Sequence, residues 1–165
     1  MLGNQVLISG RRETALKAVC EANPGMRSFV LDVTDPSAIR DAARRVAEEF
    51  PALHCLINNA GVQKAHELAS DKPLDEQAVL EEVNTNLRGV IRVDSAFLPH
   101  LEGRPAATFV NVSSELACFP VYCATKATAL VHIVAAAPTA GQGRKGHRTD
   151  PALRRHQGCR IQIAT

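Results

Sequence analysis

The sequence has few aromatic residues and no long apolar run. It contains no tryptophan, one tyrosine and five phenylalanines, whereas proteins that bind single-stranded nucleic acids commonly stack bases on aromatic side chains. No apolar run approaches the roughly 20 residues that span a bilayer, and no signal peptide opens the chain. We therefore expect a cytoplasmic protein with neither a nucleic-acid partner nor a membrane partner.

The cysteines lack both an even number and the spacing of metal ligands. They are scattered along the chain as Cys20, Cys55, Cys118, Cys123 and Cys159. An odd, dispersed set is typical of a reduced cytosolic protein and not of a disulfide-stabilised secreted one. The histidines likewise form no metal-ligand grouping. The sequence therefore predicts no metal site.

Acidic residues are scarce at one end of the chain. From residue 138 onward, six lysines and arginines accompany the single acid Asp150, whereas the preceding part carries 13 basic and 16 acidic residues. This basic end has no sustained helical or strand period, and it closes on one short, mainly apolar stretch at residues 161–164. We predict an α/β domain over residues 1–135 and a basic, mostly disordered tail over residues 136–165.

The rest of the chain alternates short apolar runs with amphipathic stretches. Strands are expected at 4–9, 27–33, 53–58 and 107–112, and helices at 13–23, 36–50, 74–101 and about 121–135. Asp35 and Pro36 supply a cap and a proline at a helix start. Such alternation predicts βαβ units and therefore a doubly wound parallel sheet with helices on both faces.

Residues 111–126 carry the clearest chemical signal, because there a strand end leads into a helix. Tyr122 and Lys126 are four residues apart, so they lie on the same helix face. An ammonium beside a phenol favours the phenolate, which makes Tyr122 a candidate general acid or base. Ser114 is a candidate hydrogen-bond partner for a neighbouring carbonyl oxygen. Taken alone, a tyrosine four residues before a lysine is a weak signal, because such a pair usually belongs to a solvated helix face.

Three further motifs accompany this pair. They are Asn-Asn-Ala-Gly at 58–61, Asn-Leu-Arg-Gly at 86–89 and Asp-Val-Thr-Asp at 32–35. In this order and at these separations, the four motifs resemble the short-chain dehydrogenase/reductase family over about residues 2–130. The sequence around them is most similar to the family's DltE-like bacterial branch. The resemblance implies a Rossmann-like fold and hydride transfer between NAD(P)H and a small-molecule carbonyl or alcohol.

The resemblance also implies a role for each candidate catalytic residue. Tyr122 would exchange a proton with the substrate, and Lys126 would tune Tyr122 and hold the nicotinamide ribose. Ser114 would orient the substrate oxygen. Asn86 would hold a water in the proton relay, which would explain an asparagine in mid-helix, where this residue is otherwise unfavourable.

Further residues match the family's cofactor-binding positions. Asn59, Ala60 and Gly61 match the strand-end turn on the adenine ribose side, and a plain strand-to-loop turn is the alternative reading. Asp32 and Val33 match the pair beside the adenine ring.

Arg11 and Arg12 lie where members of the family that use NADP place basic residues against the 2′-phosphate. An acid there would have indicated NAD. The resemblance therefore favours NADP and leaves NAD open. A solvated helix start is the alternative reading, because the arginine side chain suits water as well as phosphate.

The sequence departs from the family in three places. No glycine-rich, pyrophosphate-binding turn precedes residue 4, and Ser114 precedes Tyr122 by only eight residues, fewer than the family usually has. Beyond residue 130 the family pattern stops. The glycines at 141–146 are spaced like a dinucleotide fingerprint but lack a leading strand and a following helix, so we reject them as a site.

These departures predict an incomplete fold. The family's first strand is central, so its loss leaves two unpaired inner edges unless they close up or recruit another strand. We expect weak cofactor binding and an impaired oxidoreductase, truncated relative to its family. The alternatives are a non-catalytic interaction protein, which would form a homo-oligomer through the helix at 74–101, and, ranked last, a nucleic-acid binder using the basic tail.

Overall fold

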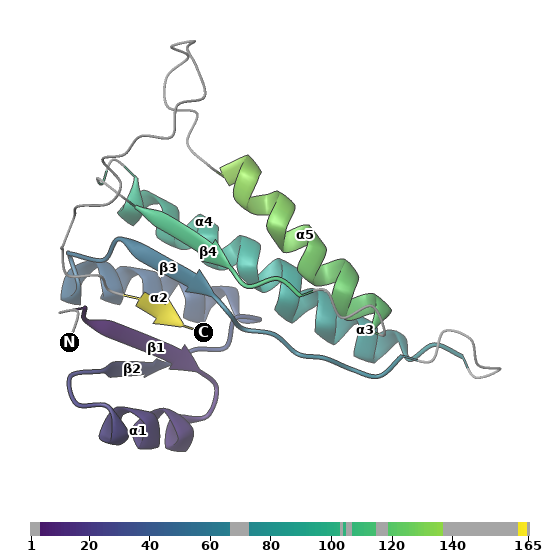
Figure 1. The fold of residues 1–165 in the computed structure, drawn as a ribbon, viewed down its shortest axis with the longest axis horizontal. Coiled ribbons are helices and arrows are strands. Elements are labelled where there is room, and N and C mark those ends of the chain that lie inside the picture. Colours follow the sequence, from purple (N-terminus) through teal and green to yellow (C-terminus); the bar gives the residue numbers. More distant parts are fainter. Residues whose placement is uncertain are drawn as a thin grey trace, which may run out of the picture.

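The computed structural model describes residues 4–66, 73–102, 104, 107–114, 119–136 and 162–164. Its strands form one parallel sheet, drawn in Figure 1, and are β1 (Val6–Gly10), β2 (Arg27–Val30), β3 (Cys55–Asn58), β4 (Thr108–Asn111) and β5 (Gln162–Ala164). The helices are α1 (Glu13–Ala22), α2 (Pro36–Glu49), α3 (Glu76–Val83), the π-helix η1 (Asn84–Gly89), α4 (Val90–Leu101) and α5 (Pro120–Ala136). The predicted alternation of strands and helices, and with it the α/β fold class, is confirmed.

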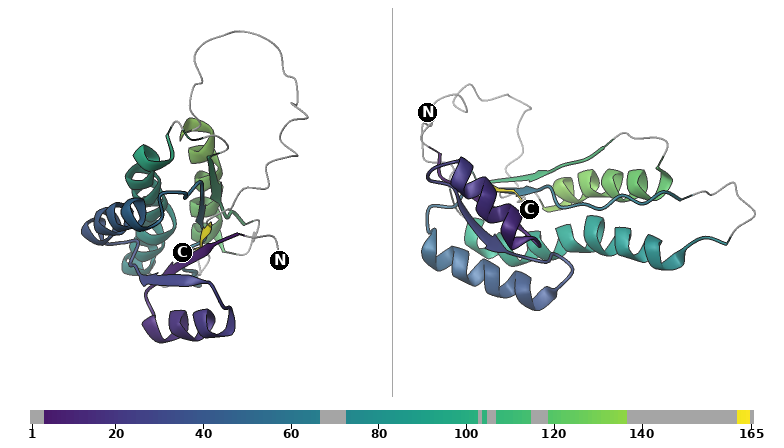
Figure 2. Two further views of the ribbon diagram at one scale, coloured as in Figure 1. Left: turned by 90° about the vertical axis from the view of Figure 1, so that its left-hand side faces the viewer. Right: turned by 90° about the horizontal axis from the view of Figure 1, so that it is seen from below.

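The predicted helix at 74–101 is divided into three consecutive parts. A π-helical stretch, η1, separates α3 from α4, and such stretches are frequent at functional sites. Figure 2 shows α5 running beside this helix, while α1 lies near the opposite edge of the sheet beside β2. None of the helices in the described part of the chain is long and apolar enough to cross a membrane.

The sheet has the order β2-β1-β5-β3-β4, so the C-terminal strand β5 is central. Ile163 is in register with Leu7 of β1 on one side and with Leu56 of β3 on the other. The two inner edges are thus paired through a recruited strand (yellow in Figure 1). This alters the predicted division of the chain, because residues 162–164 belong to the sheet. Residues 137–161 of the predicted tail lie outside the described residues.

The hydrophobic core lies between the sheet and the helices α2 and α4. Leu7 of β1 and Leu56 of β3, the strands on either side of β5, belong to it. Ile39, Val46 and Phe97 belong to it from the two helices. α2 begins where sequence predicts, since the Asp35 carboxylate accepts hydrogen bonds from the amides of Ser37 and Ala38. The hydrogen bond from the Ser37 hydroxyl, at 2.6 Å, and these two amide bonds lower the pKa of Asp35. The core therefore holds α4, and with it η1, against the sheet.

Gly89, at the end of η1, lets the helix approach the chain that follows β2. A Cβ atom on Gly89 would lie 3.0 Å from Val33 Cγ2 and 3.2 Å from the Val33 carbonyl oxygen. We expect Gly89→Ala to lower the free energy of unfolding by about 1–3 kcal/mol, measured by urea denaturation. Gly10→Ala is the control, because its Cβ would meet only Leu16 Cδ2, at 3.8 Å. Equal unfolding midpoints for the two variants would contradict a tight contact at Gly89.

Candidate cofactor pocket and acid–base site

A cavity of about 490 Å³ lies beyond the carboxyl ends of β1, β2 and β3. In open α/β sheets, ligands bind in the crevice at these strand ends. Seven predicted cofactor-binding residues line it, namely Arg11, Arg12, Asp32, Val33, Asn59, Ala60 and Gly61. The structure therefore brings together residues that come from three separate strand ends.

Arg11 and Arg12 line this cavity next to the N-terminus of α1. Ser9 lines the same wall. Its side chain is buried, with 6% of the residue exposed, and its hydroxyl has no hydrogen-bond partner in the described part of the chain. Guanidinium groups, a free hydroxyl and a helix N-terminus all favour an anion. This donor set fits a phosphate group such as the 2′-phosphate of NADP.

Asp32 and Val33 line the cavity from the turn after β2. The Asp32 carboxylate accepts hydrogen bonds from the Thr34 amide at 2.8 Å and from the Thr34 hydroxyl at 2.7 Å. Arg92 of α4 donates to the Thr34 carbonyl oxygen at 3.1 Å. The Asp32 side chain therefore stabilises its own turn, and the turn presents both residues to the cavity.

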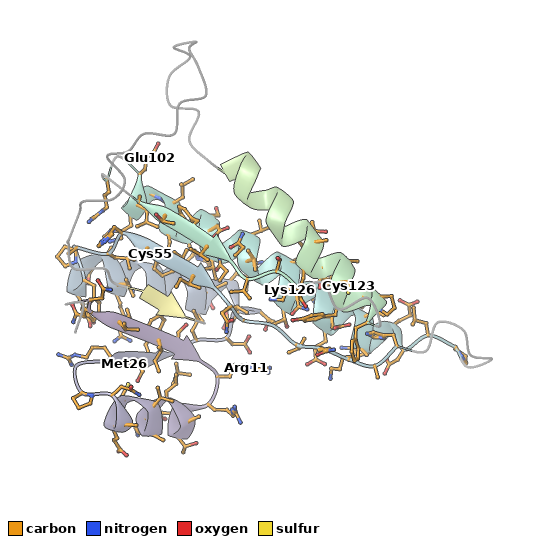
Figure 3. All side chains as sticks on the ribbon, in the orientation of Figure 1. Arg11, Met26, Cys55, Glu102, Cys123 and Lys126 are labelled. Atoms are coloured by element: carbon orange, nitrogen blue, oxygen red, sulfur yellow. The ribbon has the colours of Figure 1, made fainter. Side chains whose placement is uncertain are left out.

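Gly61 connects the cavity to Lys126 of α5. A Cβ atom on Gly61 would lie 3.2 Å from Lys126 Nζ and 3.4 Å from Asn86 Oδ1. Figure 3 shows Lys126 pointing from α5 toward the chain that follows β3, with Arg11 at the end of β1. Only 3% of Lys126 is exposed, and burial lowers its pKa. The cofactor cavity and the predicted acid–base residues are thus neighbours.

Tyr122 and Lys126 lie on one face of α5, as their spacing predicts. The Lys126 ammonium is 5.8 Å from the centroid of the Tyr122 ring. Ser114 follows the end of β4, but residues 115–118 lie outside the described residues. The approach of Ser114 to Tyr122 therefore stays a prediction.

Asn86, in η1, is fully buried and links two other elements. Its Oδ1 accepts a hydrogen bond from the Val62 amide at 2.8 Å, and its Nδ2 donates to the Val62 carbonyl oxygen at 2.8 Å and to the Thr125 hydroxyl at 3.2 Å. The Thr125 hydroxyl in turn donates to the Tyr122 carbonyl oxygen. The side chain therefore positions the segment after β3 against α5, and the relay water stays a prediction.

A buried polar cluster, which the sequence analysis did not identify, holds the strand ends that carry the site. Asn58 donates from Nδ2 to Asp94 of α4 and to Asn111, both at 2.6 Å. Asn58 and Asn111 are register partners in β3 and β4. The only sequence signal was an asparagine at the end of each apolar run. The cluster therefore fixes the strand ends from which the turn at 59–61 and the residues leading to Ser114 begin.

Comparison with known proteins identifies the family. The profile described as short chain dehydrogenase matches residues 1–140. The chain belongs to the short-chain dehydrogenase family. It is 37% identical over 132 residues to the uncharacterized oxidoreductase DltE of Bacillus subtilis, covering 76% of this chain and 52% of that protein. It is 34% identical over 136 residues to the NADPH-dependent 1-acyldihydroxyacetone phosphate reductase of Schizosaccharomyces pombe, and the match covers 79% of this chain and 44% of that protein.

Solved structures agree with this assignment. Serine dehydrogenase from Escherichia coli superposes with a TM-score of 0.71 at 26% identity, covering 81% of this chain and 63% of that one. A short-chain dehydrogenase from Streptomyces avermitilis superposes with a TM-score of 0.72 at 26% identity, covering 98% of this chain and 56% of that one. This short-chain dehydrogenase chain spans about half the length of the curated relatives it matches.

The Lys126 ammonium is buried, with 3% of the residue exposed. Because burial of a charge is unfavourable, Lys126→Met is expected to raise the free energy of unfolding by ~1 kcal/mol or more at neutral pH. The folded-state pKa lies below that of the unfolded chain, so the gain should shrink as the pH rises through the lowered pKa. Chemical denaturation at neutral and alkaline pH measures both effects.

Lys17→Met is the matched control for this prediction, because Lys17 is an exposed lysine paired with Glu13. It should change stability little at either pH. A Lys126→Met variant that is less stable than the wild type would show that the ammonium is satisfied in the folded chain.

Proposed function

We propose that this short-chain dehydrogenase chain is an NADP(H)-dependent oxidoreductase that transfers a hydride between the cofactor and a small carbonyl or alcohol. The observation that carries the proposal is the cavity of predicted cofactor residues that meets the buried Lys126 through Gly61. Two relatives support NADP: the NADPH-dependent 1-acyldihydroxyacetone phosphate reductase of Schizosaccharomyces pombe, 34% identical, and the NADP-dependent 3-hydroxy acid dehydrogenase YdfG of Salmonella typhi, 28% identical.

In this proposal the cofactor supplies or accepts the hydride, and side chains of the chain bind it and move the proton. Arg11, Arg12 and the unpartnered hydroxyl of Ser9 would hold the 2′-phosphate. The Lys126 ammonium would favour the Tyr122 phenolate and bind the nicotinamide ribose.

Proton transfer would then take place at the phenolic oxygen. Tyr122 would donate its proton to the carbonyl oxygen during reduction and recover it during alcohol oxidation. Ser114 would donate a hydrogen bond to the same substrate oxygen and so orient the substrate.

Weak cofactor binding and low turnover are part of the proposal. The phosphate-binding groups described above gather at the Arg11 end of the cavity. No glycine-rich turn of the described residues faces a pyrophosphate, and such a turn supplies much of the affinity for a dinucleotide.

A second candidate function is a non-catalytic interaction protein, which one observation favours. The long helix exposes large apolar side chains, with Leu80 of α3 52% exposed and Ile91 of α4 41% exposed. Pairing of two copies through this helix would cover them. A dimeric mass in solution without NADPH-dependent turnover would favour this candidate, and a monomer would exclude it.

A fluorescence titration with NADPH and NADH tests the cofactor assignment. We expect NADPH to bind more weakly than low-micromolar, and NADH to bind about tenfold more weakly still, because charge-assisted bonds to the 2′-phosphate are lost. The double variant Arg11→Ala/Arg12→Ala should reduce NADPH affinity to the level of NADH. Arg44→Ala/Arg45→Ala, on the exposed face of α2, is the control for net charge. Failure of both cofactors to bind would contradict the proposal.

A further inference from the structure

The segment that follows β3 runs extended beside α3 and η1, and two buried polar side chains of that helix face it. Glu82 of α3 and Asn86 of η1 are four residues apart and both are 0% exposed. Neither residue belongs to the hydrophobic core, and Glu82 has no role in the proposed hydride transfer. A buried carboxylate is unfavourable unless it is paired and hydrogen-bonded, so its partners indicate what it does.

The partners of these two side chains are alternate residues of one extended segment. Asn86 binds the amide and the carbonyl oxygen of Val62. Glu82 Oε1 accepts from the Lys64 amide at 3.1 Å, and Glu82 Oε2 is 2.6 Å from His66 Nε2. The side chains of both His66 and Glu82 are buried, with 2% and 0% exposed.

Glu82 and Asn86 lie on either side of the junction between α3 and η1. Their backbone partners, Lys64 and Val62, are two residues apart in the segment. These contacts form a ladder between the helix and the segment. An exposed ion pair between Lys64 and Glu81, at 3.0 Å, lies beside this ladder and is expected to add little.

We infer that Glu82 and His66 are positioning residues for the cofactor pocket. Neither lines the cavity, whereas Gly61 and Val62, at the start of the same segment, do. By holding Lys64 and His66 on α3, the pair keeps Val62 in register with Asn86 and keeps Gly61 against Lys126. This inference rests on the proposed function for its effect on NADPH, but its effect on the segment is independent of it.

Hydrogen–deuterium exchange of the segment 61–66 in Glu82→Leu tests the inference. Loss of two acceptors for a buried amide and a buried imidazole should speed exchange of this segment about tenfold and leave α2 unchanged. NADPH affinity should fall about fivefold or more. Glu82→Gln, which keeps an acceptor for Lys64 and a donor for His66, should restore both properties. Glu81→Leu is the matched control, because it removes the neighbouring exposed carboxylate.

His66→Leu gives a second route if Glu82→Leu does not fold, and it should likewise speed exchange of the segment and weaken NADPH binding. Unchanged exchange at 61–66 in the folded variants, or faster exchange without any loss of NADPH affinity, would overturn the positioning role. If exchange rises but the wild type itself does not bind NADPH, the ladder stands and the proposed function fails.

Discussion

Tyr122→Phe is expected to lower the rate of NADPH-dependent reduction of para-nitrobenzaldehyde by ~10²–10⁴-fold, the usual contribution of a positioned general acid. This electron-poor aldehyde needs little activation, so it suits an enzyme of low turnover. The ring of the variant still packs below Lys126, and NADPH affinity should therefore change by no more than about twofold. Loss of NADPH absorbance, followed at saturating aldehyde, measures the rate.

Thr128→Ala is the control for this variant, because Thr128 lies farther along α5 and its hydroxyl donates to the Ala124 carbonyl oxygen within the same helix. Its rate should equal that of the wild type. A Tyr122→Phe rate equal to that of Thr128→Ala would contradict the assignment of Tyr122. Absence of turnover in the wild type would contradict the proposed oxidoreductase activity and favour the non-catalytic interaction protein.

Ile163→Pro is expected to lower the free energy of unfolding by ~3 kcal/mol or more. Both edges of β5 are paired, so the amide of Ile163 faces a neighbouring strand whichever way it points, and proline removes that donor. For a chain of this size the melting temperature should fall by roughly 6–12 °C. Thermal unfolding followed by circular dichroism provides the measurement.

Ile163→Val is the control, because valine keeps the backbone amide, and it should lower the melting temperature much less than Ile163→Pro. Indistinguishable melting temperatures for Ile163→Pro and the wild type would show that β5 does not hold β1 and β3 together. The central position of the C-terminal strand would then be wrong.

Most of the architecture could be predicted because its signals are local. The helix 74–101 and the strand before Asn58 follow from periodicity and apolar runs, and Asp35 marks a helix start through its cap. β5 could not be placed in this way. It has three residues, and its pairing with Leu7 and Leu56 depends on contacts between distant parts of the chain, which no local pattern contains.

The convergence of the cofactor residues was also predictable, since the carboxyl ends of parallel strands meet at one edge of a sheet. The supporting polar residues were not. Ser9, Asp94 and Glu82 are buried, yet in a sequence they look like ordinary surface residues. Only their partners in space distinguish them. Asn86 shows the same limit, because its bonds to Val62 became evident only in the structure.

In the proposed function, the cavity at Arg11 and the Tyr122–Lys126 pair form a single cofactor site. Since Tyr122 is the only tyrosine, a chain labelled with ¹³C-tyrosine gives NMR ring signals from this residue alone. Titration with NADPH should shift these signals saturably, with the dissociation constant found by cofactor fluorescence, and the shift should weaken in Arg11→Ala/Arg12→Ala. NADPH binding that leaves the Tyr122 ring signals unmoved would contradict the claim.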